Sequence, residues 1–224
     1  MYDWAMRHEI LFQPEFAVVK VMLEPGEAIR AESGAMMTMS ANIALDSKIS
    51  GGLGKMFGRM LTGESAFQTT FTANNGPGEV ILAPGLPGDI VTVDVSQRPL
   101  IVTSGAFLAG DVRMDFKTQA SMKGFFGGEG LFMSEISGPG LLLLSSYGAI
   151  LPIELAPGQP YIVDTGHLVA FSSGMGYNLR KATKSLLGSV TSGEGVVAEM
   201  VGPGTVYTQT RTVSALIAMM PVRG

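Results

Sequence analysis

The sequence predicts a mainly β protein: three tandem pseudo-repeats of short antiparallel strands around a pseudo-threefold axis, with one or two short helices. The first observation is a Gly-Glu motif that recurs at even spacing, at residues 63–64, 128–129 and 193–194. The second is a Gly-Pro-Gly turn signal after each copy, at residues 76–78, 138–140 and 202–204. The third is composition, because 30 glycines and only 15% charged residues are typical of many short strands and turns.

The first element is a strand over residues 15–24, where apolar residues precede a Pro25-Gly26 turn. A second turn follows at Ser33-Gly34, and the same pattern returns from Pro157-Gly158 to Thr165-Gly166. In the middle of the chain Pro84-Gly85 lies much farther from its Ser104-Gly105 turn. The extra residues include the alternating segment 89–95, which predicts an added strand.

Each Gly-Glu motif leads into a further strand, as the apolar residues Leu131, Met133 and Ile136 indicate in the middle copy. Gly-Pro-Gly then turns the chain into the next strand. The repeats therefore cover about residues 15–80, 81–142 and 143–213. Because each is too small to bury its own apolar face, we expect a single domain over residues 1–224 with a shared core.

Three variable links between the turns and the Gly-Glu motifs mix basic and large apolar residues. In the third link, residues 178–187 predict a short helix that is capped by Asn178 and ended by Gly188. Such segments either cover the end of a β core or contact an anionic membrane surface or a partner. The candidate contact residues are Lys55, Phe57, Arg59, Lys123, Phe125, Phe126, Lys181, Lys184, Leu186 and Leu187.

Composition restricts the classes of function and the location. The net charge of −4 and the pI of about 5.2 argue against nucleic-acid binding. The absence of cysteine excludes disulfides and thiolate metal sites. No signal peptide or membrane span is expected, which predicts a cytoplasmic protein or one peripheral to the inner face of the cell membrane. The low share of charged residues predicts an apolar surface that another subunit or a membrane covers, and we expect a homo-oligomer.

No motif predicts catalysis, a metal site or a cofactor. The recurring motif positions are interpreted as turn residues, although the three glutamates could also form a ring that binds a hard cation. The histidines His8 and His167 lie in unrelated contexts and are interpreted as structural. The motif positions are Gly63, Glu64, Gly128, Glu129, Gly193, Glu194, Gly34, Gly105 and Gly166.

Methionine is abundant, with 15 residues, and Met36, Met37 and Met39 cluster after the first Ser-Gly turn. Methionine fills irregular gaps in cores and also serves adaptable binding surfaces. We expect core filling here, and an exposed position would instead favour an oligomer or partner surface.

The run 54–67, with residues 32–36 and Gly88-Asp89-Ile90, resembles the prokaryotic branch of the altered-inheritance-of-mitochondria (mitochondrial biogenesis) family. The resemblance covers nearly the whole chain. It implies a fold like that of the tryptophan RNA-binding attenuation protein, related to double-stranded β-helices. Eukaryotic members are associated with the mitochondrial inner membrane, and the family offers no catalytic residues to carry over.

The function expected from these observations is that of a non-catalytic oligomeric scaffold or adaptor, peripheral to a membrane in one version. The first alternative is a nucleic-acid or small-ligand binding module, which rests on fold resemblance alone. The second alternative is a metal-dependent enzyme that uses the motif glutamates.

Overall fold

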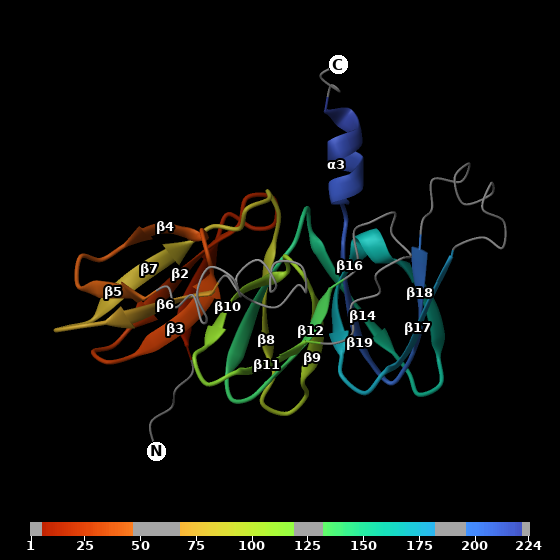
Figure 1. Cartoon of the computed structure of the whole chain (residues 1–224), viewed down its shortest axis with the longest axis horizontal. Helices are drawn as coiled ribbons and strands as arrows, with labels where there is room; N and C mark the ends of the chain where they lie inside the picture. Colours follow the sequence, from red (N-terminus) through yellow and green to blue (C-terminus); the bar gives the residue numbers. More distant parts are fainter. Residues whose placement is uncertain (1–5, 47–67, 119–131, 182–195, 221–224) are drawn as a thin grey trace, which may run out of the picture.

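The protein is mainly β, with antiparallel strands arranged in four sheets that lie side by side along the long axis of the molecule (Figure 1). The computed structural model describes residues 6–46, 68–118, 132–181 and 196–220. The prediction of a mainly β protein is therefore confirmed. The pseudo-threefold axis remains a prediction.

Apart from β1 (Arg7–Leu11), the strands fall into three consecutive sets of six. Set 1 consists of β2 (Val18–Leu23), β3 (Ala28–Glu32), β4 (Met36–Met39), β5 (Ile43–Asp46), β6 (Gln68–Ala73) and β7 (Gly78–Leu82). Set 2 consists of β8 (Ile90–Asp94), β9 (Leu100–Thr103), β10 (Phe107–Asp111), β11 (Asp115–Thr118), β12 (Met133–Ser137) and β13 (Leu141–Ser145). Set 3 consists of β14 (Ile150–Leu155), β15 (Pro160–Asp164), β16 (Leu168–Ser172), β17 (Gly176–Lys181), β18 (Val196–Val201) and β19 (Gly204–Gln209).

The same four pairings occur within every set. The first and third strands pair with the sixth, as β2 and β4 do with β7. The second and fourth strands pair with the fifth, as β3 and β5 do with β6. Sets 2 and 3 repeat this scheme with their own strands. Each set therefore contributes three strands to each of two sheets.

Two junctions join the sets edge to edge. The second strand of one set pairs with the third strand of the next, as β3 with β10 and β9 with β16. These junctions produce two six-stranded sheets, β5-β6-β3-β10-β13-β8 and β11-β12-β9-β16-β19-β14. The remaining sheets, β1-β2-β7-β4 and β15-β18-β17, contain the strands of set 1 and set 3 that have no such neighbour among the described residues.

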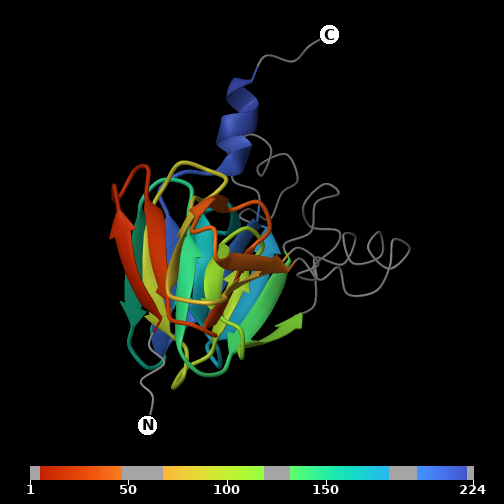
Figure 2. The same cartoon turned by 90° about the vertical axis from the view of Figure 1, so that its left-hand side faces the viewer.

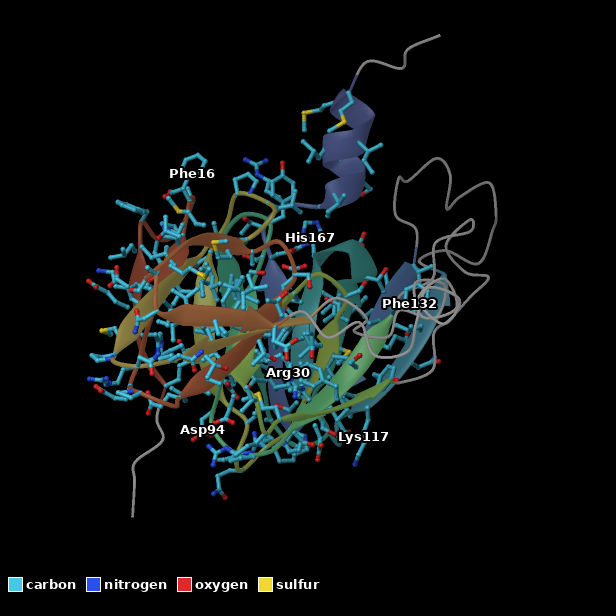
Figure 3. All side chains as sticks on the ribbon, turned by 60° about the vertical axis from the view of Figure 1, so that its left-hand side comes forward. Phe16, Arg30, Asp94, Lys117, Phe132 and His167 are labelled. Carbon is cyan, nitrogen blue, oxygen red and sulfur yellow. The ribbon has the colours of Figure 1, made fainter. Side chains whose placement is uncertain are left out.

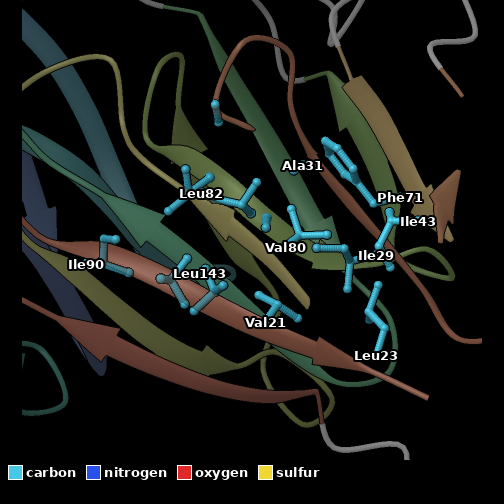
Figure 4. Close-up of a cluster of buried hydrophobic side chains, with 14 of the residues drawn as sticks. Val21, Leu23, Ile29, Ala31, Ile43, Phe71, Val80, Leu82, Ile90 and Leu143 are labelled. Carbon is cyan, nitrogen blue, oxygen red and sulfur yellow. The ribbon is translucent and has the colours of Figure 1, made fainter. Parts of the chain in front are cut away.

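The buried apolar residues form three clusters rather than the single shared core that we expected. One cluster lies between each pair of neighbouring sheets. In the first, Val21 and Val80 from one sheet pack with Ile29, Phe71 and Leu143 from the next (Figure 4). Because each sheet is apolar on the face toward its neighbour, a row of sheets buries its apolar faces pairwise without a common centre.

The segment 89–95 is a strand, as predicted, but it is not an addition to the second repeat. Strand β8 is the first strand of set 2, equivalent by its pairing to β2 and β14. Pro84-Gly85 is not the equivalent of Pro25-Gly26, because it lies before β8 rather than after it. The turn that corresponds to Pro25-Gly26 is residues 95–99, which connect β8 to β9 without a Pro-Gly pair.

The predicted helix over residues 178–187 is wrong at its start, because residues 176–181 form β17. Asn178 and Leu179 lie opposite Glu199 and Ala198 of β18, and Arg180 forms an ion pair with Glu199. Pairing with β18 therefore outweighs the local helical preference. Residues 182–188 lie outside the described part of the chain.

The longest described helix is α3 (Val213–Met219), and a 3₁₀ turn, η1, covers Thr165–His167. The Thr212 side chain caps α3 by accepting a hydrogen bond from the Ala215 N–H at 3.2 Å. The helix projects from the sheets, as both side views show (Figure 1, Figure 2). The end of the molecule from which it projects is called the upper end below.

We predict that Phe71→Ala lowers the free energy of unfolding by about 3–5 kcal/mol, because Phe71 is fully buried in the first cluster. The matched control is Phe16→Ala, since the Phe16 side chain is 72% exposed, and its expected effect is within about 0.5 kcal/mol. Urea unfolding followed by circular dichroism measures both changes. Equal losses in the two variants would contradict the assignment of the core.

We also predict that Gly88→Ala destabilises the protein by about 1–3 kcal/mol, the cost of overpacking. A Cβ atom at Gly88 would lie only 2.0 Å from the Ser146 carbonyl oxygen, where β-bridge pairing joins Gly88 to Gly148. A Cβ atom at Gly85 would meet nothing within 4 Å, so Gly85→Ala is the control. The same urea titration compares them, and a stable Gly88→Ala variant would refute the close approach.

Candidate interaction surfaces

The basic and apolar residues that the sequence singled out mostly lie outside the described residues. This applies to Lys55, Phe57, Arg59, Lys123, Phe125, Phe126, Lys184, Leu186 and Leu187. Lys181 ends β17, next to the third link. The links connect β5 to β6, β11 to β12 and β17 to β18, which are antiparallel neighbours in each set. The links are thus attached at equivalent positions, and their contacts remain predictions.

The recurring glycines divide into two groups. Gly63, Glu64, Gly128, Glu129, Gly193 and Glu194 lie outside the described residues. Gly34 and Gly105 adopt φ values of 89° and 84°, the left-handed region that their turns require. Gly166 lies instead in η1, where its N–H donates to the Asp164 carboxylate at 2.7 Å. Gly34 and Gly105 therefore have the turn conformation that the sequence predicts. At Gly166 a hydrogen bond to the Asp164 side chain takes the place of the left-handed glycine.

A half-open cleft of about 640 Å³ lies at the base of α3. Its lining includes Glu32, Thr103 and Asp164, which end the second strands of the three sets. Burial raises the pKa of the Glu32 carboxyl above its ordinary value. The volume is in the range of small-molecule pockets.

Two threonine hydroxyl groups that line this cleft bond to backbone carbonyls. The Thr103 hydroxyl lies within hydrogen-bond distance of the Leu168 and Val169 oxygens, at 3.1 and 2.9 Å, and the Thr165 hydroxyl donates to the Val196 oxygen at 2.9 Å. The His167 ring donates from Nδ1 to the Gln209 oxygen at 2.6 Å. These side chains therefore have structural partners rather than the geometry of a nucleophile and its base.

The other histidine, His8, is also held structurally. Its ring nitrogens lie 2.9 Å from the Met6 oxygen and 2.7 Å from the Thr92 hydroxyl. Within residues 6–46, 68–118, 132–181 and 196–220, no group of three or more His, Asp or Glu side chains is placed to hold a metal ion. The structural interpretation of both histidines agrees with these contacts.

Among the described strands, β4 and β15 lie at sheet edges, and both present large apolar side chains to solvent. On β4, Met36, Met37 and Met39 are all exposed, so core filling was the wrong expectation for this cluster. On β15, Tyr161 and Ile162 are exposed. Part of the evidence for the β4 surface was present in the sequence, because exposed methionines in this cluster were expected to indicate an oligomer or partner surface. The β15 edge was missed.

Further exposed apolar side chains lie at the upper end of the molecule, in the turn between β1 and β2 and on α3. Phe12 and Phe16 are exposed in the turn between β1 and β2, and Val213, Ile217, Met219 and Met220 are exposed on and after α3. Phe16 and α3 both lie at this end (Figure 3). No helix among the described residues has the length and hydropathy that crossing a bilayer requires.

Comparisons with known proteins agree with the sequence resemblance. The model of the family described as mitochondrial biogenesis AIM24 matches residues 8–211. An uncharacterized protein of Streptococcus pyogenes serotype M6 is 34% identical over 219 residues, which cover 93% of this chain and 87% of that protein. The X-ray crystal structure of a Streptococcus pyogenes protein is similar with a TM-score of 0.82 and 31% identity, covering 95% of this chain and 97% of that one. The fold, the length and the sequence motifs thus lead to one conclusion: the chain belongs to the mitochondrial biogenesis AIM24 family.

Proposed function

We propose that the protein is a non-catalytic scaffold that acts by binding other protein chains, including copies of itself. The observation that carries this proposal is the exposure of large apolar side chains on β4 and β15. An edge strand also presents unpaired N–H and C=O groups, which pair readily with a strand of another chain. An apolar edge without guarding charges is therefore a binding surface.

We further infer that the chain is one domain of three structural repeats, over about residues 15–80, 81–142 and 143–213. The recurring pairing scheme supports three repeats. It places β7 wholly in the first repeat and β13 wholly in the second, so by pairing the boundaries fall within residues 83–89 and 146–149. The pseudo-threefold axis and the likeness to the attenuation protein rest on the sequence resemblance. A repeat protein of this kind needs polar caps at its ends to stay monomeric. Apolar edges at both ends favour assembly instead.

The second candidate function is contact with an anionic membrane surface, at a cytoplasmic location on the inner face of the cell membrane. The exposed side chains of Phe12, Phe16 and Ile217 at the upper end favour it. Aromatic and aliphatic side chains bury readily in the interfacial region of a bilayer. The basic residues of the three links would add electrostatic attraction.

We predict that the purified protein self-associates at about 10 µM, a concentration at which an interface of micromolar affinity is largely occupied. Met37→Glu should shift the population toward monomer, because a charge would replace an exposed apolar side chain at the contact. Analytical ultracentrifugation measures both species. The control is Leu151→Glu on β14, a similarly exposed apolar residue. A wild-type chain that stays monomeric up to about 100 µM would contradict self-assembly.

For the second candidate, we predict flotation with anionic vesicles that weakens at high salt, since each Lys or Arg near the surface contributes about 1 kcal/mol. Replacing both Phe12 and Phe16 by serine should weaken binding at least about tenfold, because a buried Phe side chain contributes about 1.5–3 kcal/mol. Leu151→Ser is the control for general loss of apolar surface. Absence of flotation on every vesicle would remove this candidate.

A further inference from the structure

We propose that β4 of one copy pairs antiparallel with β15 of a second copy, in the same way that consecutive sets pair inside the chain. This inference rests on the proposed scaffold function and names its partner as the chain itself, joined head to tail. Strand β4 is the third strand of set 1, and β15 is the second strand of set 3. Inside the chain, the strands in these two positions pair with each other at both junctions.

The pairing would complete the two incomplete sheets. Among the described residues, β4 and β15 lie at sheet edges, whereas their equivalents β10, β16, β3 and β9 lie inside six-stranded sheets. Joining the edges gives the order β17-β18-β15-β4-β7-β2, with β1 added beyond β2. This order matches that of the two six-stranded sheets, strand for strand.

The two edges lie at opposite ends of the molecule. Strand β4 lies at the left end in Figure 1, and β18, the neighbour of β15, lies at the right end. A single copy therefore cannot join its own β4 to its own β15. The contact must form between two copies.

The apolar side chains on these edges correspond to side chains that the internal junctions bury. When the third strands are aligned on Gly34, Gly105 and Gly166, Met37 corresponds to Leu108 and Val169. Met37 is 59% exposed, whereas Leu108 and Val169 are 0% and 1% exposed.

The second strands show the same contrast when they are aligned on the same glycines. Ile162 is 57% exposed, and its equivalent Ile101 is 5% exposed. Tyr161 is likewise exposed where Leu100 is buried. A second copy would therefore bury these side chains as the internal junctions bury their equivalents.

The β4 edge differs in charge from the other described edges, and β15 belongs to the edges with the fewest charges. Natural edge strands carry charged residues that oppose pairing. Strand β4 has none, and β15 carries only its terminal Asp164. Four of the other described edge strands carry a charged residue inside the strand: Glu9 in β1, Lys117 in β11, Glu154 in β14 and Arg180 in β17. Strands β5 and β8 carry only a terminal acid, Asp46 and Asp94, as β15 does.

The irregularities of the two strands do not block the contact. The register shift in β4 between Met36 and Thr38 recurs at the equivalent place in β10 and β16, and both of these strands pair on their other side. Pro160 at the start of β15 corresponds to Pro99, whose carbonyl accepts a hydrogen bond from the Ser173 N–H at 2.8 Å. Both features are therefore compatible with a paired edge.

The internal junctions also give the register. Ala109 lies opposite Ala31, and Ala170 lies opposite Val102. The equivalent pairs between copies are Thr38 with Val163, Met39 with Ile162 and Ser40 with Tyr161. Such a contact uses different surfaces on the two partners, so it continues from copy to copy as a ring or a filament.

Two edge-blocked variants test this geometry. Met39→Glu blocks β4 and leaves β15 free, and Ile162→Glu blocks β15 and leaves β4 free. We expect each variant alone to associate at least about tenfold more weakly than wild type, a factor that equals about 1.4 kcal/mol. Mixed together, they should form a one-to-one heterodimer, because the free β15 of the first fits the free β4 of the second. Analytical ultracentrifugation with one variant fluorescently labelled measures the heterodimer, and Leu45→Glu on β5 is the control.

The outcomes separate this inference from the proposed function. If the wild type forms oligomers but the two blocked variants form no heterodimer, the head-to-tail contact is wrong. The protein would then be a scaffold that uses another surface. Self-association of either blocked variant at wild-type strength would also overturn it. A wild-type chain that stays monomeric would overturn this inference and the self-assembly part of the proposed function.

Disulfide cross-linking gives a second measurement that does not depend on the charged variants. The chain has no cysteine, so Met39→Cys mixed with Ile162→Cys provides a unique pair. Opposite residues of antiparallel strands are about 4.5–5.5 Å apart at Cα, which suits a disulfide. Mild oxidation should join the two variants into heterodimers, and Leu45→Cys with Ile162→Cys should yield far fewer. Equal yields would contradict the register.

Discussion

The arrangement of the molecule depends on backbone pairing between the second strand of one set and the third strand of the next. At β3–β10 and β9–β16 this pairing turns three-stranded units into continuous sheets. The apolar clusters depend on it as well. The first cluster contains Leu108 and Leu143 from set 2, and the cluster of set 3 contains Ile101 and Met133 from set 2. No set therefore completes its core without its neighbour.

Much of the strand pattern could be predicted from the sequence because local turn chemistry determines it. Gly34 and Gly105 need a left-handed backbone, and each Gly-Pro-Gly separates two strands. Periodicity could not reveal which strands pair, so β8 was misinterpreted as an addition. Residues 178–181 were likewise not predictable as a strand from local sequence, because they pair with β18, about 20 residues later in the chain.

The candidate surfaces were less predictable, because an edge strand and an interior strand of similar composition look alike in sequence. Met37 and Leu108 occupy equivalent positions and are both apolar, yet in the described part of the chain only the strand of Leu108 has a neighbouring strand on its outer side. When the three Ser/Thr-Gly turns are aligned, Met37 falls on the third strand of the first set and Ile162 on the second strand of the last set. Among the second and third strands, these are the two that have no pairing strand from a neighbouring set within the described chain. To recognise these two edges one needs the order of strands in the sheets, which the hydrophobicity of single residues does not give.

The division of the interior into three clusters has a consequence for motion. Each cluster is bounded by two sheets, so an outer sheet can detach while the two clusters farther along remain packed. The middle cluster is enclosed by the two six-stranded sheets and has no outer sheet to lose. We therefore expect the centre to open at higher free energy than the two ends, where strands β4 and β15 lie.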